Sequence, residues 1–115
     1  MSDERFPKGE RLRKRKDFLR VDAKKTHRIL TEHIIILAAP NPERLTRIGI
    51  TVSKRIGTAV KRNRYKRLFR EIYRRHKELF PSGYDFVLIA RKPDNSVRHE
   101  TLFQEISNAL GSRTW

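Results

Sequence analysis

Apolar residues gather in short segments whose composition is typical of β-strands. Residues 33–39 are rich in β-branched side chains and apolar on both faces, and Pro40-Asn41-Pro42 ends this strand. Residues 47–53 place isoleucine and valine on one face and small or polar residues on the other. The short gap between these two segments predicts an antiparallel hairpin. Residues 84–90 predict another strand, and residues 25–30 predict a short edge strand.

Other segments carry apolar residues at helical spacing. The first predicted helix covers residues 11–24, and the second opens at Gly57-Thr58 and continues to about residue 79. The third follows a loop at residues 91–95 and would be capped by Asn95 or Ser96. In the first helix, the expected apolar stripe consists of Leu12, Leu19 and Ala23, with Phe18 beside it.

The order helix, strands, helix, strand, helix is typical of a small α+β domain. We expect a four-stranded, mainly antiparallel sheet packed by helices. A chain of 115 residues forms one domain rather than two. The predicted RNA-binding domain discussed below therefore covers residues 1–115, with an irregular arm at residues 1–10 and a tail at residues 111–115.

The chain is strongly basic, with 28 Lys and Arg residues, 13 Asp and Glu residues and a formal net charge of +15. Residues 1–28 hold eleven basic and five acidic side chains, and residues 53–77 hold eleven basic side chains and one acid. Self-repulsion of this size destabilises a small domain unless a polyanion surrounds it. Nucleic acid is therefore the leading partner and an anionic membrane surface the second, and no small-molecule substrate is indicated.

Several other classes of protein are excluded by what the sequence lacks. It has no cysteine, which rules out a disulfide framework, a thiolate zinc site and a thiol nucleophile. Its histidines show no metal-ligand or paired catalytic spacing, so we expect neither a catalytic residue nor a metal site. These histidines are His27, His33, His76 and His99. The longest apolar run, residues 34–39, is too short to span a bilayer, and no secretory signal is visible. We therefore expect a cytoplasmic protein without a membrane partner.

The second predicted helix separates its apolar and basic residues onto opposite faces. The apolar stripe, assigned to the core, consists of Tyr65, Leu68, Phe69, Ile72, Tyr73 and His76. The opposite stripe consists of Asn63, Lys66, Arg67, Arg70, Arg74 and Lys77, with Arg62 and Arg64 on its flanks. The helix start, which the macrodipole already makes positive, carries the further cations Lys54, Arg55 and Lys61. Because these like charges repel without an anion, the pattern favours a phosphate-binding surface over a solvated one.

The sequence resembles a known family over nearly its whole length. The run at residues 47–71 contains Arg62-Asn63-Arg64, preceded by Ala59-Val60 and followed by Lys66-Arg67 and Arg70. Further matching residues are Arg11-Leu12 and Asp17-Phe18 upstream and residues 89–93 downstream. In this order and spacing, the sequence is similar to the protein subunit of bacterial ribonuclease P.

The resemblance implies a subunit of a ribonucleoprotein endonuclease that removes the 5′ leader from precursor tRNA. The RNA subunit would carry the catalysis and its magnesium ions, and the protein would hold no cofactor. The protein would bind the catalytic RNA through Lys54, Arg55, Lys61, Arg62, Asn63, Arg64, Lys66, Arg67 and Arg70. The resemblance also implies a left-handed strand–helix–strand crossover, against the usual preference.

A cleft between the first helix and one face of the sheet would, by the same resemblance, hold the single-stranded leader of precursor tRNA. Phe18 matches an aromatic residue of that cleft, although its periodicity fits a core residue nearly as well. Arg11, Lys14 and Arg15 would contact phosphates of the leader or of the RNA subunit. Some members of the family carry aromatic residues at the positions of Asp22 and Ile36.

Two other functions fit the composition. A general RNA-binding protein of the ribosomal type would share the basic helix but have no role in tRNA processing. An independent protein nuclease would need a positioned acid and base, for which the sequence offers no convincing pair.

Overall fold

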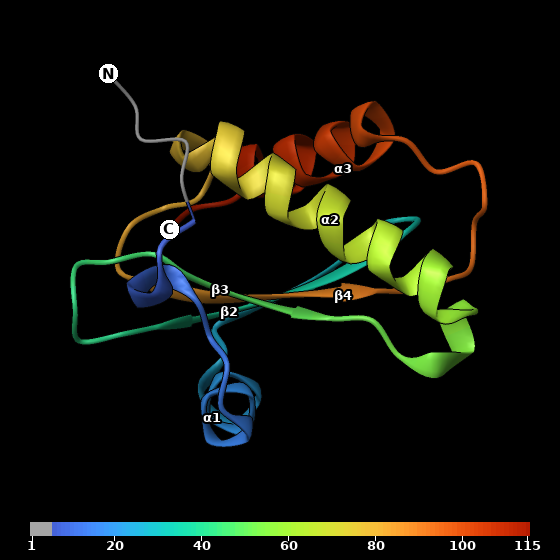
Figure 1. Ribbon diagram of the computed structural model, residues 1–115. Helices are drawn as coiled ribbons and strands as arrows, with labels where there is room; N and C mark the ends of the chain where they lie inside the picture. Colours follow the sequence, from blue (N-terminus) through green and yellow to red (C-terminus); the bar gives the residue numbers. More distant parts are fainter. Residues whose placement is uncertain (1–5) are drawn as a thin grey trace.

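The computed structural model describes residues 6–115 and contains one sheet, three α-helices and short 3-10 turns (Figure 1). The strands are β1 (His27–Leu30), β2 (Ile34–Pro40), β3 (Arg47–Thr51) and β4 (Tyr84–Ala90). The helices are α1 (Arg15–Lys24), α2 (Ala59–Arg75) and α3 (His99–Gly111). The turns are η1 (Lys8–Glu10), η2 (Lys54–Ile56) and η3 (Lys77–Leu79). These elements confirm the predicted α+β class, whereas residues 1–5 of the predicted arm lie outside the described residues.

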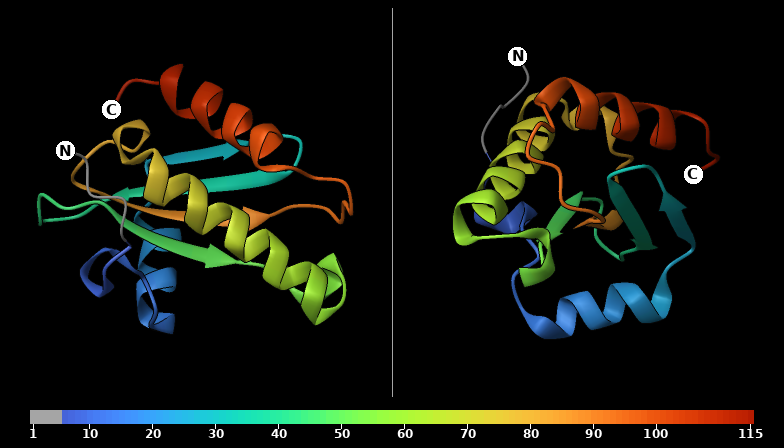
Figure 2. Two further views of the ribbon diagram at one scale, coloured as in Figure 1. Left: turned by 45° about the horizontal axis from the view of Figure 1, so that its top comes forward. Right: turned by 90° about the vertical axis from the view of Figure 1, so that its right-hand side faces the viewer.

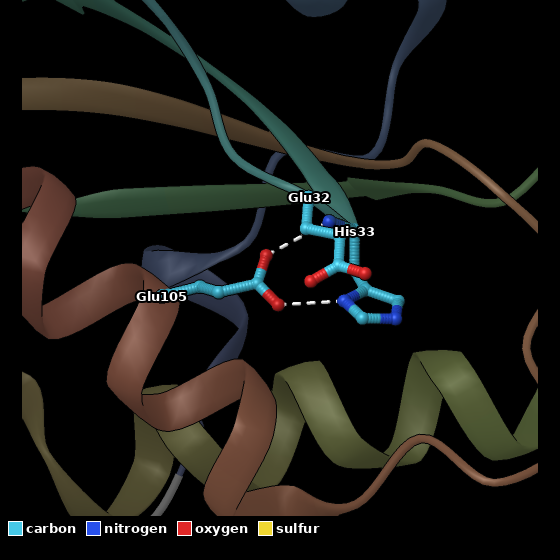
Figure 3. A group of neighbouring side chains, drawn as sticks. All are labelled: Glu32, His33 and Glu105. Atoms are coloured by element: carbon cyan, nitrogen blue, oxygen red, sulfur yellow. Dashed lines mark hydrogen bonds and ion pairs between the residues drawn. The ribbon is translucent and has the colours of Figure 1, made fainter.

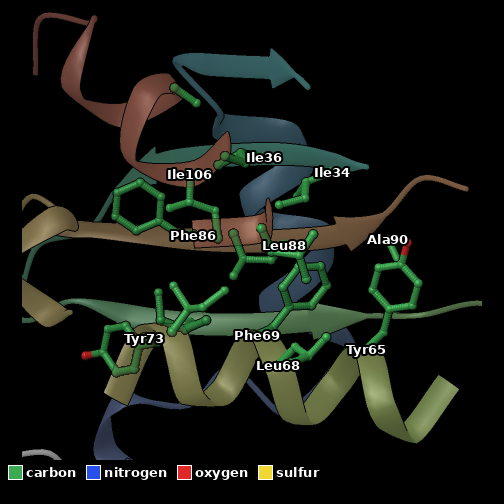
Figure 4. Packing of buried hydrophobic residues seen from close by; sticks show 14 of the residues in the cluster. Ile34, Ile36, Tyr65, Leu68, Phe69, Tyr73, Phe86, Leu88, Ala90 and Ile106 are labelled. Atoms are coloured by element: carbon green, nitrogen blue, oxygen red, sulfur yellow. The ribbon is translucent and has the colours of Figure 1, made fainter. Parts of the chain in front are cut away.

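The sheet separates two layers of helices. Helices α2 and α3 cover one face of the sheet, and α1 crosses the other face (Figures 1 and 2). The larger core lies on the side of α2 and α3, where the predicted apolar stripe of α2 from Tyr65 to Tyr73 packs against alternate residues of the central strands (Figure 4). His76, the last predicted member of the stripe, lies outside the helix and is half-buried. A smaller core under α1 consists of Leu12, Val21, Leu37, Ala39 and Val87, with Phe18, Ile35 and Ile89 partly buried beside it.

The predicted hairpin between residues 33–39 and 47–53 is wrong, because β4 lies between β2 and β3. The strand order is β1-β2-β4-β3; β4 pairs antiparallel with β2 and parallel with β3. Strands β2 and β4 are apolar on both faces, which suits central strands, whereas β3 carries small or polar residues on one face and lies at the edge. Through α2, the connection from β3 to β4 is a left-handed crossover, as the resemblance implies (Figures 1 and 2).

The first helix is shorter than predicted and presents a different stripe to the sheet. It begins at Arg15 because the preceding residues are extended, and the Leu12 N–H donates to the Ile48 carbonyl at 2.9 Å. Val21 is fully buried against the sheet, whereas Leu19 is 54% exposed. The predicted stripe of Leu12, Leu19 and Ala23 therefore does not form, because residue 12 precedes the helix.

Helix α2 begins where predicted and ends four residues early. The Thr58 side chain accepts a hydrogen bond from the Lys61 N–H at the start of the helix. Gly57 precedes it with a φ of 145°, a conformation that L side chains rarely adopt. The chain leaves the helix at His76 and turns through η3, so the predicted end at residue 79 is wrong.

The last helix begins later than its expected caps. Asn95 and Ser96 lie in the loop, because the Asp94 carboxylate accepts hydrogen bonds from both the N–H and the hydroxyl of Ser96. Helix α3 starts at His99, with Arg98 at its N-cap position. At the other end, the tail folds back: the Trp115 ring nitrogen donates to the Leu110 carbonyl at 2.9 Å, and its ring stacks on His27.

A buried carboxylate ties α1 to the sheet. Asp85 is 1% exposed and receives hydrogen bonds from Arg47 at 2.7 and 2.8 Å, from Arg20 of α1 at 2.9 Å and from Asn41 at 2.9 Å. The same Arg20 guanidinium also donates to the Pro40 carbonyl. Four donors thus converge on one acid, and they fix α1 relative to β2, β3 and β4.

Candidate RNA-binding surface

The cationic face of α2 points away from the core. Asn63, Arg67 and Arg70 are exposed on this face, and Lys61 is exposed at the start of the helix. Arg62, Arg64 and Lys66 lie half-buried on its flanks. Lys54 and Arg55 of η2 are exposed just before the helix. The structure therefore brings all nine predicted RNA-binding residues onto α2 and the turn that leads into it.

These cations lack acidic partners among residues 6–115. No ion pair to another described residue is formed by Lys54, Arg55, Lys61, Arg62, Arg64, Lys66, Arg67 or Arg70. Lysines elsewhere do pair: Lys77 lies 3.2 Å from Glu10, and Lys92 lies 2.9 Å from Glu32. The Nε of Arg62 is shielded from solvent and has no hydrogen-bond partner among residues 6–115. Since the positive end of the helix dipole lies among these charges, the surface suits phosphate groups.

The predicted leader-binding residues fall into two places. Phe18 is half-buried on α1, and its ring covers Gly49 so closely that a Cβ added there would lie 2.7 Å from the Phe18 Cε1. Lys14 and Arg15 are exposed at the start of the same helix. Phe18 therefore belongs partly to the smaller core and partly to the surface.

Arg11, by contrast, lies toward α2. Its Nε donates to the Phe6 carbonyl at 2.8 Å, and its guanidinium lies over the Phe6 ring. Together with Arg13 and Arg70 it lines a groove of about 480 Å³ at the β3 edge. Arg11 and Arg13 thus extend the cationic surface of α2 toward α1.

The positions of Asp22 and Ile36 differ in what they face. Ile36 is fully buried in the larger core under α2 and α3, so it does not face α1. The residues of β2 on the α1 side are instead Ile35 and Leu37. Asp22 is exposed and pairs with Lys25 at 3.0 Å.

Sequence reasoning missed a buried polar network around His33 (Figure 3). The ring lies 2.6 Å from a Glu105 oxygen through Nδ1 and 2.8 Å from an Asp94 oxygen through Nε2. The other Glu105 oxygen accepts from the His33 N–H and the Thr31 hydroxyl. Burial lowers the pKa of His33, but the hydrogen bonds to Asp94 and Glu105 outweigh burial and raise it above its usual value.

The same cluster has the spacing of a metal site. Glu32, His33 and Glu105 place one possible ligand atom each within 4.8 Å of one another. Both ring nitrogens of His33 already bond to carboxylates, so this arrangement is an ion-pair network joining the β1–β2 turn, α3 and the loop before α3. Spacing along the chain does not predict this network, because Glu105 lies 72 residues from His33.

Fold and surface together define a small α+β RNA-binding protein. No helix within residues 6–115 is long and apolar enough to cross a membrane. A family model described as ribonuclease P matches residues 6–113. The ribonuclease P protein component of Citrifermentans bemidjiense is 40% identical over 113 residues, covering 96% of this chain and 94% of that protein. The corresponding protein of Petrotoga mobilis is 44% identical over 92 residues, covering 80% and 77% of the two chains.

Solved structures agree with the sequence comparisons. The ribonuclease P protein from Thermotoga maritima superposes with a TM-score of 0.82 at 34% identity, covering 92% of this chain and 99% of that one. The chain therefore belongs to the ribonuclease P protein family. Its role is that of the protein subunit in tRNA 5′ processing, beside an RNA component.

Proposed function

We propose that the cationic face of α2 binds the catalytic RNA, and that the α1 side of the sheet binds the single-stranded leader of precursor tRNA. In this proposal the RNA carries the catalysis and its magnesium ions. The protein neutralises phosphate repulsion between two RNA molecules and positions the leader. This assembly would work in the cytoplasm.

One observation carries the proposal. Eight cations of α2 and η2 have no acidic partner among the described residues, although the same chain pairs its lysines elsewhere. A phosphate-rich partner supplies the missing anions and releases counterions on binding. The described residues do include a histidine between carboxylates, but His33 is 4% exposed and both ring nitrogens are engaged, so it cannot reach a scissile phosphate.

The test of RNA binding uses the double variant Arg62→Ala/Arg64→Ala. Its affinity for the RNA component should fall, and the slope of log affinity against log salt should flatten by about one to two units. The matched control is Arg44→Ala/Arg98→Ala, which removes two exposed arginines outside the α2 face. Equal slopes for the two double variants would contradict the proposal.

Reconstitution separates this function from its rivals. Purified protein with precursor tRNA should cleave only when the RNA component is present, and the protein should lower the magnesium concentration that cleavage requires. Cleavage by the protein alone would indicate an independent nuclease. Absence of stimulation would indicate a general RNA-binding protein.

Leader binding has its own test. Phe18→Ala should weaken binding of leader-bearing precursor more than binding of mature tRNA, since base stacking contributes about 1–3 kcal/mol per base. Equal losses with both RNAs would assign Phe18 to the core alone.

A further inference from the structure

An exposed apolar side chain stands among the cations at the start of α2. Val60 is 79% exposed, the highest fraction among the exposed large hydrophobic residues. It borders a hollow of about 230 Å³ that is also lined by Ile56, Lys61, Arg64, Tyr65 and Asn95. A β-branched residue there gains nothing from the core and is not a strong helix former. The position of Val60 therefore needs an explanation outside the chain's own packing.

The walls of this hollow are fixed by the fold. Ile56 and Tyr65 are each 2% exposed, and the Tyr65 hydroxyl donates to the Lys92 carbonyl at 2.8 Å. Burial raises the pKa of Tyr65 to about 12, so this hydroxyl keeps its proton at neutral pH. Asp94, which also lines the hollow, is fixed by hydrogen bonds to His33 and Ser96. The hollow is therefore already formed in the free protein.

Its chemistry matches one kind of occupant. Its apolar lining residues are Ile56, Val60 and Tyr65, and its polar ones are Lys61, Arg64, Asp94 and Asn95. The exposed Asn95 amide has no hydrogen-bond partner among residues 6–115. The volume is below the ~300–1,000 Å³ of pockets for drug-sized ligands, so a single ring system fits. A nucleobase has apolar faces and a polar edge, and it is joined to a phosphate that the two cations would attract.

We propose that this hollow takes one unstacked nucleobase of the RNA component, with Val60 against the base, Asn95 at its polar edge and Lys61 with Arg64 on the adjoining phosphate. The inference rests on the proposed function, because it assigns a base contact beside the phosphate contacts of α2. The protein would then recognise an unstacked nucleotide of the RNA in addition to the charge of the RNA backbone.

The experiment compares Val60→Ser and Asn95→Ala with Leu45→Ser in binding to the RNA component over a series of salt concentrations. Leu45 is 48% exposed, so its substitution controls for a general loss of apolar surface. Val60→Ser should weaken binding about fivefold to tenfold with an unchanged salt slope, since it removes a base contact and no charge. Val60→Ile should bind within about twofold of the wild type. Circular dichroism checks that each variant is folded.

The outcomes distinguish the two proposals. The base pocket would be overturned if Val60→Ser left the affinity unchanged while Arg62→Ala/Arg64→Ala weakened binding and flattened the salt slope. The proposed function would then stand, and the hollow would suit a protein partner. Unchanged binding for all these variants would overturn both proposals. Equal losses for Val60→Ser and Leu45→Ser, or a changed slope for Val60→Ser, would also overturn the base pocket. A photo-cross-linking side chain at position 60 should attach to a single unpaired nucleotide, and attachment only to paired segments would contradict the inference.

Discussion

Replacing Asp85 by Asn should destabilise the protein strongly, because the carboxylate holds α1 against the sheet. The substitution preserves the size of the side chain and one acceptor oxygen. It removes the negative charge that faces Arg47 and Arg20, at 2.7 and 2.9 Å. The amide nitrogen of the new side chain would also point a donor at groups that are themselves donors.

The magnitude follows from the burial of each partner. Removing one member of a buried ion pair costs about 3–5 kcal/mol, since the other charge is left without compensation. Asp85 is fully buried, but the side chains of Arg47 and Arg20 are 23% and 36% exposed and can recover part of their hydration. We therefore expect a loss of about 3 kcal/mol in the free energy of unfolding. Arg20→Gln alone should cost about 1 kcal/mol, because that guanidinium lies nearer the surface.

Urea denaturation at fixed pH and ionic strength measures these losses. Trp115 is the only tryptophan, and its ring lies 5.5 Å from that of Phe86 in the larger core, so its fluorescence reports on unfolding of that core. In the Asp85→Asn background, Arg20→Gln should cost less than in the wild type. A loss below about 1 kcal/mol for Asp85→Asn, or full additivity of the two substitutions, would refute the assignment of Asp85 as the residue that fixes α1.

Two further predictions concern His33 and Gly49. The pKa of His33 is raised in the folded protein, so protonated His33 stabilises the fold. This contribution is complete below the unfolded-state pKa of about 6.5, and it is lost as the pH rises through the folded-state pKa. Urea denaturation from pH 6 to 8 should show this decline, and His33→Gln should abolish it; a persisting decline would exclude His33 as its source. Gly49→Ala should cost about 1–3 kcal/mol by displacing the Phe18 ring, whereas Gly9→Ala should cost little, because nothing lies within 4 Å of a Cβ there. Equal losses at the two glycines would contradict that contact.

The elements that sequence reasoning predicted best are those whose pattern is local. Strand β4 has the predicted bounds, and the apolar stripe of α2 from Tyr65 to Tyr73 is buried, because period alone determines which residues face the core. The sheet order could not be obtained in this way. The position of β4 between β2 and β3 depends on the crossover through α2. The short connection between β2 and β3 favours a hairpin instead, which is why the sequence predicted one.

The candidate surface was predictable because it lies on one helix. Spacing along α2 places Asn63, Arg67 and Arg70 together, and the structure leaves them exposed. The networks around Asp85 and His33 join residues far apart in sequence, so no local pattern indicates them. The start of α1 was mispredicted for a related reason: residue 12 hydrogen bonds to β3, a contact that periodicity does not include.

The distribution of the acids explains why salt should act in opposite directions on the free protein and on its RNA complex. Asp85 and Glu105 are committed to internal networks and Glu10 pairs with Lys77, which leaves the α2 face with unpaired cations. In the free protein these cations repel one another, and screening, with a Debye length of about 10 Å at 0.1 M, relieves that repulsion. In the proposed complex the same cations would contact phosphates, so added salt should weaken binding. Bound RNA would supply the stabilising anions in place of salt, and it would raise the free energy of unfolding with the logarithm of its affinity. The unpaired face is therefore a source of instability only while its partner is absent.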